Sequence, residues 1–261
     1  MKGIKIEPFP NWDIENSVIE RDVKKHISTS SKIKKIVNKV MMTINFFNNG
    51  DRRVNFMIPE EYKGRTYMSV FPNPIQLYFS YSIDALKTAD ALRLEEFPKY
   101  SKKIKDEEKY ILNITSDETH PIYNSYLQFK ISSIIMLTCS LEAFINSMIK
   151  EDFEHLDINQ NKLTQEQIQR KLSIKEKITI VMPQYYRIDF KSKYKTDYDL
   201  IMSLVRLRNE FVHLKNYNKS PMSTEYQSLF LDLMKFKSYQ SIKSVKNYIN
   251  TYKPNFIKEQ N

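Results

Sequence analysis

The sequence predicts a mainly α-helical protein, in which a helical bundle over residues 116–261 follows a smaller α+β region over residues 1–115 that contains a β-hairpin. Two observations lead to this fold class. After residue 116, apolar residues recur at alternating gaps of three and four, as on the buried face of a helix. Before that point, an Asn-Gly pair separates two β-type runs, which is typical of a tight hairpin turn.

The α+β region is predicted from the residues around Asn49-Gly50. Alternation of apolar with polar or flexible residues predicts a half-buried strand after this turn, at Val54, Phe56 and Ile58. Residues 64–71 are a candidate third strand, and the apolar pattern that follows predicts a helix ending before Pro98. The lysine-rich residues 99–110 fit either a solvated connection or the exposed face of a helix.

The bundle is predicted to begin with a long helix. Ser116 or Asp117 is its candidate N-cap, and Pro121 is tolerated in a first helical turn. Its expected buried stripe is Ile134, Leu137, Leu141, Phe144 and Met148. Three further helices are predicted: residues 173–182 ending at Pro183, residues 197–215 capped by Thr196 or Asp197, and residues 224–252 ending before Pro254.

Composition limits the possible functions. The net charge of +10 favours anionic partners such as nucleic acid or an acidic protein, although the cations are spread along the whole chain. The only three glycines are Gly3, Gly50 and Gly64, so a P-loop, a dinucleotide-binding loop and a Gly-x-Ser-x-Gly elbow are all excluded. The single cysteine, Cys139, excludes an internal disulfide and is expected to be a small core residue.

We expect a cytoplasmic protein with no membrane segment. The first 22 residues carry acids early and have no continuous apolar core, unlike a signal peptide. The longest apolar run, residues 131–145, contains Glu142 and is shorter than the ~20 residues that a membrane span needs.

The segment RLRNEFVHLK, residues 206–215, carries the candidate chemistry. On a helix of 100° per residue, one apolar stripe contains Leu200, Leu204, Leu207, Phe211 and Leu214. A second apolar strip contains Ile201, Val205 and Val212. A helix with two apolar faces needs two partners, which we expect to be its own core and another subunit.

Three polar residues, Arg208, Asn209 and His213, bracket the second strip. Asn209 and His213 lie one turn apart, so the amide is expected to orient the imidazole. The long side chain of Arg208 is needed for it to converge with His213. These residues by themselves favour a structural role, because arginine and histidine late in a helix suit its dipole and an Asn–His pair can simply form a hydrogen bond.

The segment LVRLRNEFVHLK resembles the signature helix of HEPN domains, in which an arginine and a polar residue precede a histidine after four to six intervening positions. Arg208, Asn209 and His213 match this motif at the short end of the spacing. Upstream, SLEAFINSMIKED (140–152) is similar to a helix that often precedes the motif, with Glu142 and Asn146 at the matching polar positions. The resemblance covers residues ~116–252 and none of the first 115.

The resemblance implies a helical homodimer with two Arg/His pairs in a cleft between subunits. It further implies a metal-independent endoribonuclease, with no cofactor, of a toxin–antitoxin or phage-defence system. Arg208, His213 and Asn209 are then catalytic, with Glu142 and Asn146 in support, and the neighbouring cations Arg206 and Lys215 are candidates to bind RNA. The partners implied are RNA, a second copy and a cognate antitoxin or defence protein. The alternative is an inactive HEPN-like module that dimerises or docks a protein or nucleic acid.

The sequence offers one possible metal site. Glu151 and His155 have the i,i+4 spacing of two metal ligands on a helix, but two ligands do not complete a site. A solvated helix end explains them better, and we expect no metal.

Overall fold

The computed structural model describes residues 4–5, 41–46, 52–70, 72–105, 108–113, 116–156, 160–213 and 224–259. The chain divides into two compact units, one of residues 7–73 and the other of residues 1–6 and 74–261. As the sequence predicts, the protein is mainly helical with small β-hairpins.

The smaller unit contains one antiparallel sheet of three strands in the order β2-β3-β4. These are β2 Met41–Phe46, β3 Arg52–Tyr62 and β4 Arg65–Val70. Phe46 pairs with Arg52 at the end of the first hairpin, so the predicted hairpin and third strand are confirmed, although Asn49-Gly50 itself lies outside the described residues. Lys63 and Gly64, both at positive φ, make the two-residue turn between β3 and β4.

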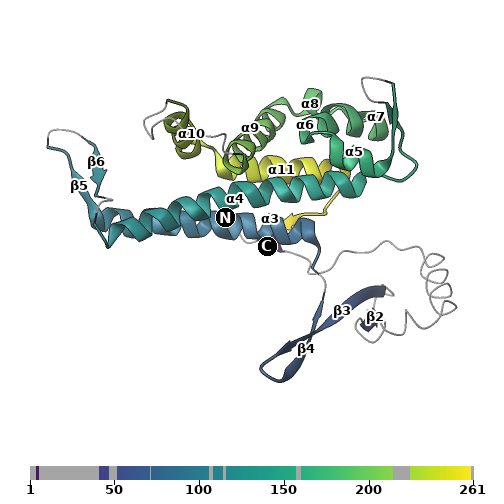
Figure 1. Ribbon diagram of the computed structural model, residues 1–261, viewed down its shortest axis with the longest axis horizontal. Helices are drawn as coiled ribbons and strands as arrows, with labels where there is room; N and C mark the ends of the chain where they lie inside the picture. Colours follow the sequence, from purple (N-terminus) through teal and green to yellow (C-terminus); the bar gives the residue numbers. More distant parts are fainter. Residues whose placement is uncertain are drawn as a thin grey trace. The chain divides into compact units, whose positions relative to one another are not determined.

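The larger unit is built on two long antiparallel helices, α3 and α4 (Figure 1). They are α3 Pro74–Ala91 and α4 Thr119–Met148, joined by η1 Leu92–Glu96, η2 Phe97–Tyr100, β5 Ser101–Lys103 and β6 Tyr110–Leu112. Small side chains let the two helices approach: the Ser82 and Ser133 hydroxyls lie 3.4 Å apart, and Ser140 donates to the Ile75 carbonyl at 2.7 Å. This pair makes the most extensive helix–helix contact of the described residues.

The boundary predicted near residue 115 is therefore not where the units divide. Helix α3 was assigned to the N-terminal region, but its buried face packs on α4 and makes it part of the bundle. The lysine-rich residues 99–110 are neither a plain connection nor a helix face, because Ser101–Lys103 pairs with Tyr110–Leu112 as a small hairpin.

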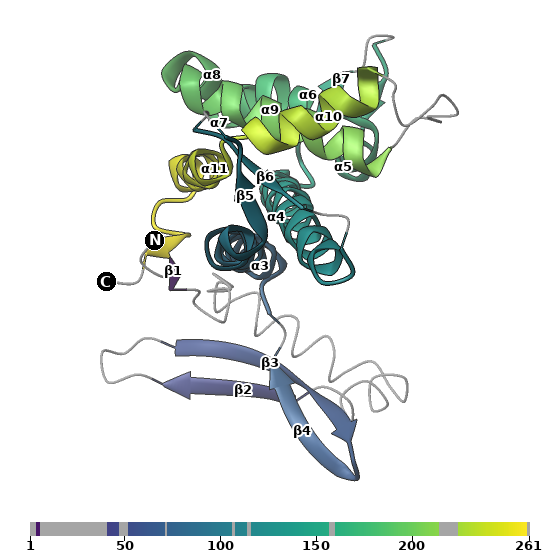
Figure 2. The ribbon, with the colours of Figure 1, turned by 90° about the vertical axis from the view of Figure 1, so that its left-hand side faces the viewer.

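The remaining elements of the larger unit cover α3 and α4 from one side (Figure 2). They are β7 His155–Leu156, β8 Lys162–Leu163, α5 Gln165–Lys171, α6 Ile174–Glu176, η3 Lys177–Val181, α7 Met182–Tyr186, α8 Phe190–Lys193, α9 Lys195–Val212, α10 Thr224–Lys235 and α11 Ser238–Tyr252. Strands β7 and β8 form a two-residue hairpin, and the terminal strands β1 Ile4–Lys5 and β9 Lys258–Glu259 pair with each other.

Side chains form hydrogen bonds with backbone groups at both ends of helix α4. The regular helix starts at Thr119, whose N–H donates to the Ser116 hydroxyl at 3.3 Å, and Pro121 lies in its first turn as predicted. At the other end, three side chains satisfy carbonyls that the helix leaves free. The donors are Gln169 to Asn146, Gln165 to Ile149 and Tyr186 to Met148, at 3.0, 2.6 and 2.7 Å.

The predicted buried stripe of α4 is confirmed. Ile134, Leu137, Leu141 and Phe144 are at most 2% exposed, and Met148 packs against the same core. Of the described helices, α4 alone is long and apolar enough to cross a membrane, with a mean hydropathy of 1.4 over its most apolar window. Of that window, 44% is buried inside the bundle.

Three predicted helix boundaries are wrong. The helix expected to stop at Pro183 continues to Tyr186, because the π turn Lys177–Val181 precedes the proline and Met182 N–H bonds to the Lys177 carbonyl. The predicted last helix is two helices, broken at Phe236–Lys237 so that each packs its own apolar face.

The third wrong boundary concerns α9. This helix starts at Lys195, before the predicted caps Thr196 and Asp197. Asp197 instead accepts hydrogen bonds across the bundle from Ser244 and Asn247 of α11, at 2.7 and 2.6 Å.

Candidate active-site groove

Helix α9 has one apolar face in the protein, where the sequence predicted two. Leu204 and Leu207 of the predicted stripe are buried, and so are Ile201 and Val205 of the predicted second strip, which join the same core. Val212, the last member of that strip, is 44% exposed. The second strip is therefore not a free surface for another subunit, because neighbouring helices of the same chain cover most of it.

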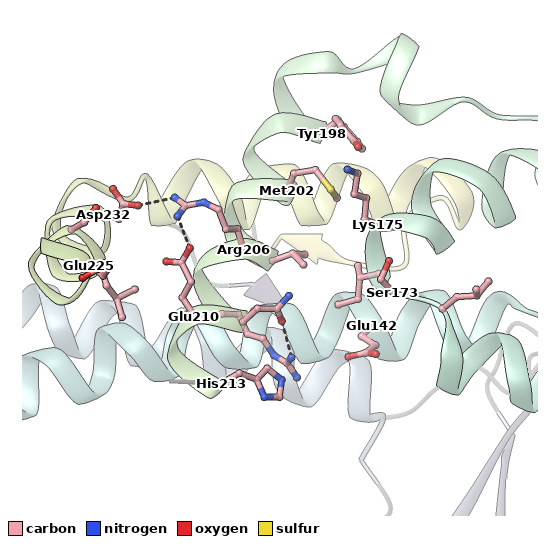
Figure 3. A pocket seen from close by; sticks show the side chains of 17 residues that line it. Glu142, Ser173, Lys175, Tyr198, Met202, Arg206, Glu210, His213, Glu225 and Asp232 are labelled. Carbon is pink, nitrogen blue, oxygen red and sulfur yellow. Dashed lines mark hydrogen bonds and ion pairs between the residues drawn. The ribbon is translucent and has the colours of Figure 1, made fainter. Parts of the chain in front are cut away.

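Helix α9 ends just before the candidate histidine. Val212 is its last residue, and His213 is the C-cap, with φ −114° and ψ 52°, whose N–H donates to the Asn209 carbonyl at 2.9 Å. Since His213 has left helical geometry, its side-chain direction no longer follows the helical wheel. The imidazole is exposed, and it lines a groove of about 1100 Å³ together with Arg208 and Asn209 (Figure 3).

The groove is formed by four segments of the larger unit. Glu142 comes from α4, Ser173 and Lys175 come from the start of α6, and Tyr198 and Met202 come from the first half of α9. The other side is formed by α10, from which Glu225 and Asp232 are labelled in Figure 3. The groove thus brings the predicted residues Arg208, Asn209, His213 and Glu142 to one site, and also Arg206.

Arg208 is half-buried and incompletely paired. Its Nη1 donates to the Asn209 side-chain oxygen at 3.0 Å, while its buried Nε has no hydrogen-bond partner among the described residues. The expected role of Asn209 differs here, because its amide oxygen holds the guanidinium and not the imidazole. Burial raises the pKa of the neighbouring Cys139 thiol, and the positive charge of Arg208 partly opposes that shift.

Arg206, predicted to bind RNA, is engaged within the protein. Its guanidinium donates to Glu210 and to Asp232, both at 2.8 Å. The bond to Asp232 is the main reason why the pKa of Arg206 is raised. Two carboxylates already occupy its donors, so Arg206 is not available to a phosphate in this arrangement. Lys215, the other predicted RNA-binding cation, lies outside the described residues.

The predicted supporting residues Glu142 and Asn146 both lie next to Lys177, which was not among the predicted site residues. Lys177 is fully buried, and its Nζ donates to Asn146 Oδ1 at 2.9 Å and to the Gln169 carbonyl at 2.6 Å. The same Nζ lies 3.8 Å from a carboxylate oxygen of Glu142. The signal was present in the sequence, because Lys177 falls among the apolar positions Ile174, Ile178 and Val181, where a solvated lysine is not expected.

The charges of the groove are mixed. Its described acidic residues are Glu142, Glu210, Glu225 and Asp232, and its described basic residues are Lys175, Arg206 and Arg208. Arg206 donates to Glu210 and Asp232, and Glu225 lies with Asp232 on α10, whereas no hydrogen bond or ion pair of the described residues joins Arg208 to a carboxylate. His213 and Lys175 lie away from α10 (Figure 3). The part of the groove suited to an anion is therefore the end that contains Arg208 and His213.

Glu151 and His155 do not form the possible metal site. Helix α4 ends at Met148, so Glu151 lies in a turn, His155 lies in β7, and the two do not share a helical face. Within the described ranges, no cluster of three or more His, Cys, Asp or Glu side chains has the arrangement of a metal site.

Comparisons of the chain with protein families, with curated proteins and with solved structures find no match.

Proposed function

We propose that this protein is a metal-independent endoribonuclease of the toxin–antitoxin or phage-defence type, with Arg208 and His213 as its catalytic pair. The observation that carries the proposal is that an exposed imidazole and a half-buried guanidinium, five residues apart in the chain, line one groove. The HEPN-like motif and the net charge of +10 support it.

The chemistry suits these two side chains. RNA contains its own nucleophile, the 2′-hydroxyl, so the protein needs only to move protons and to stabilise charge on the phosphate. Histidine acts as general base or general acid near neutral pH. Arginine binds the phosphate through its planar fork of donors and stabilises the added negative charge of the transition state. The products are a 2′,3′-cyclic phosphate and a 5′-hydroxyl.

A second copy completes the site in this proposal. One histidine does not serve easily as both base and acid in one step, whereas a homodimer that joins two grooves supplies two. The exposed C-terminal end of α9, with Val212 and His213, is the edge through which the copies would meet.

The test is RNA cleavage by the purified protein in EDTA, comparing wild type with His213→Ala. We expect the variant to lose cleavage, and its stability to change by no more than about 0.5 kcal/mol because the side chain is exposed. His155→Ala is the matched control, since His155 lies in β7 and does not line the groove. Cleavage by His213→Ala at the wild-type rate would contradict the proposal.

The acidic end of the groove favours a second candidate, the inactive binding module. Glu210 and Asp232 outnumber the one arginine that they pair with, and Glu225 lies on the same side. Such an end suits a basic segment of a partner protein better than RNA. In that case neither wild type nor His213→Ala cleaves RNA, and Glu225→Lys weakens binding of the partner.

A further inference from the structure

Lys177 is the most buried charged side chain of the described residues, with an exposed fraction of 0%. Three acceptors surround its ammonium: Asn146 Oδ1 at 2.9 Å, the Gln169 carbonyl at 2.6 Å and a Glu142 carboxylate oxygen at 3.8 Å. Two of these acceptors are side chains one turn apart on α4, and one of the two, Glu142, lines the groove. The cluster therefore connects the interior of the bundle to the proposed active site.

The local fold directs Lys177 to this place. A capping box starts α6, in which Ser173 accepts from the Glu176 N–H and the Glu176 side chain accepts from the Ser173 N–H. The chain then widens into the π turn Lys177–Val181, of which Lys177 is the first residue. Single π turns inside helices are frequent at functional sites because they redirect side chains.

Stability alone is a poor explanation for a lysine at this position. Burial lowers the pKa of Lys177, and Glu142 opposes that shift only in part, so the charged form is held at a cost. Replacing a buried ion pair by apolar groups of similar size is often neutral or stabilising. A buried charge next to a groove is instead typical of groups that set the geometry of a functional site.

Glu142 lies against the buried ammonium and lines the groove that Arg208 also lines. Arg208 lines the same groove, and both charged groups act on the thiol of Cys139, whose pKa Arg208 lowers and Glu142 raises. Cys139 precedes Glu142 by one helical turn on α4, so it reports on the charges at this end of the groove.

We propose that Lys177 is a positioning residue, whose ammonium holds the Glu142 carboxylate at the groove that Arg208 also lines, as a fixed acceptor for a hydroxyl group of the bound RNA. This inference rests on the proposed nuclease function. It gives Glu142 a contact with substrate and gives Lys177 an indirect role that acts through Glu142.

The first test is a double-mutant cycle on RNA cleavage with Glu142→Gln, Lys177→Met and the double variant. Each single variant lowers kcat/KM by on the order of tenfold or more, and the double variant is no slower than Glu142→Gln. Additive losses overturn the proposal, because they show that Lys177 does not act through Glu142. Wild-type cleavage by Glu142→Gln also overturns it.

Two control variants separate positioning from folding. Lys130→Met removes another buried lysine, which bonds Tyr126 and the Met234 carbonyl and does not line the groove, and it leaves cleavage unchanged. Glu142→Asp keeps the charge but shortens the side chain, and it lowers cleavage as Glu142→Gln does. Because Glu142 is half-buried and Lys177 is unchanged in this variant, it tests the contact of Glu142 with RNA even where Lys177→Met does not fold, and wild-type cleavage by Glu142→Asp overturns the proposal.

The second test needs no catalysis, since Cys139 is the only cysteine and its alkylation by iodoacetamide can be followed against pH. Glu142→Gln moves the pH midpoint of Cys139 alkylation to a lower value, because the negative charge of Glu142 raises the pKa of the thiol and is lost in this variant. Lys177→Met also moves the pH midpoint of Cys139 alkylation to a lower value, because the Glu142 carboxylate is no longer held. In the Glu142→Gln background, Lys177→Met produces no further shift of this midpoint. A wild-type midpoint in Lys177→Met, an upward shift, or an equal shift in both backgrounds overturns the proposal.

These two tests also distinguish failure of the proposed nuclease function from failure of the proposed role of Lys177. If the wild-type protein cleaves no RNA, the proposed function fails, and the alkylation of Cys139 alone decides whether Lys177 positions Glu142.

Discussion

Arg206 and Arg208 lie two residues apart on α9 and line the same groove, yet their surroundings are opposite. Arg206 is exposed and donates to two carboxylates, Glu210 and Asp232. Arg208 is half-buried, bonds only a neutral amide among the contacts that the structure describes, and keeps a buried Nε without a partner. The guanidinium of Arg206 is therefore already paired with carboxylates, whereas that of Arg208 is not.

This difference indicates where an anionic ligand is expected to bind. A guanidinium with two carboxylate partners gains little from a phosphate, because the phosphate must displace them and is repelled by their charge. Arg208 donates only to a neutral amide among the described contacts, so its guanidinium can donate to a phosphate without displacing a carboxylate. The two arginines therefore make a matched pair for experiment.

Of the comparisons along α9, removing Arg208 has the largest expected effect. Arg208→Ala should lower the rate of RNA cleavage by on the order of 10²–10³, as when a donor to transition-state charge is deleted. Arg206→Ala, the matched control, should change the rate by no more than a few-fold. Single-turnover cleavage measures both, and equal losses in the two variants would remove the distinction between the two ends of the groove.

Ile201 and Val212 allow a second comparison along the same helix. Ile201 is fully buried, so Ile201→Ala should lower the free energy of unfolding by about 2–4 kcal/mol. Val212 is 44% exposed, and Val212→Ala should change it by no more than about 0.5 kcal/mol. Urea unfolding gives both values. Sedimentation of Val212→Ala adds a check on the proposed dimer, because weaker self-association would place the exposed end of α9 at its interface.

The smallest expected effect concerns the capping box that starts α6. Glu176→Ala should cost about 0.5–1 kcal/mol at neutral pH by removing the bond to the Ser173 N–H. Hydrogen bonds from Ser173, first from its hydroxyl and then from its backbone, lower the pKa of Glu176 in the folded protein. A lowered folded pKa means that this stabilisation is present above about pH 5 and is lost as the pH falls.

The difference in stability between wild type and Glu176→Ala should accordingly shrink in acid. Thermal unfolding from pH 7 to pH 3 measures this change, and Lys175→Ala, which lies in the same short helix, serves as the control. A difference that is constant across this range would mean that the carboxylate of Glu176 does not contribute as an ion.

Much of the local structure could be predicted from the sequence, because each signal lies within a few residues of the structure it specifies. The alternation of Val54, Phe56 and Ile58 predicted β3, and the three-and-four spacing from Ile134 to Phe144 predicted the buried face of α4. The spacing of Arg208 and His213 predicted that they could share a site, and both line one groove. Where the prediction of α9 failed, the residues concerned, Ile201 and Asp197, contact helices distant in the chain.

What the sequence alone determined is thus the type of most elements and the residues that could act together. Only the tertiary structure decided that Arg206 pairs with Asp232, 26 residues away, and that the buried Lys177 donates to Asn146, 31 residues away. The physical reason is the distance along the chain over which each interaction acts. Helix and strand signals act between neighbours in the chain, whereas the surroundings of a charge depend on which helices pack beside it.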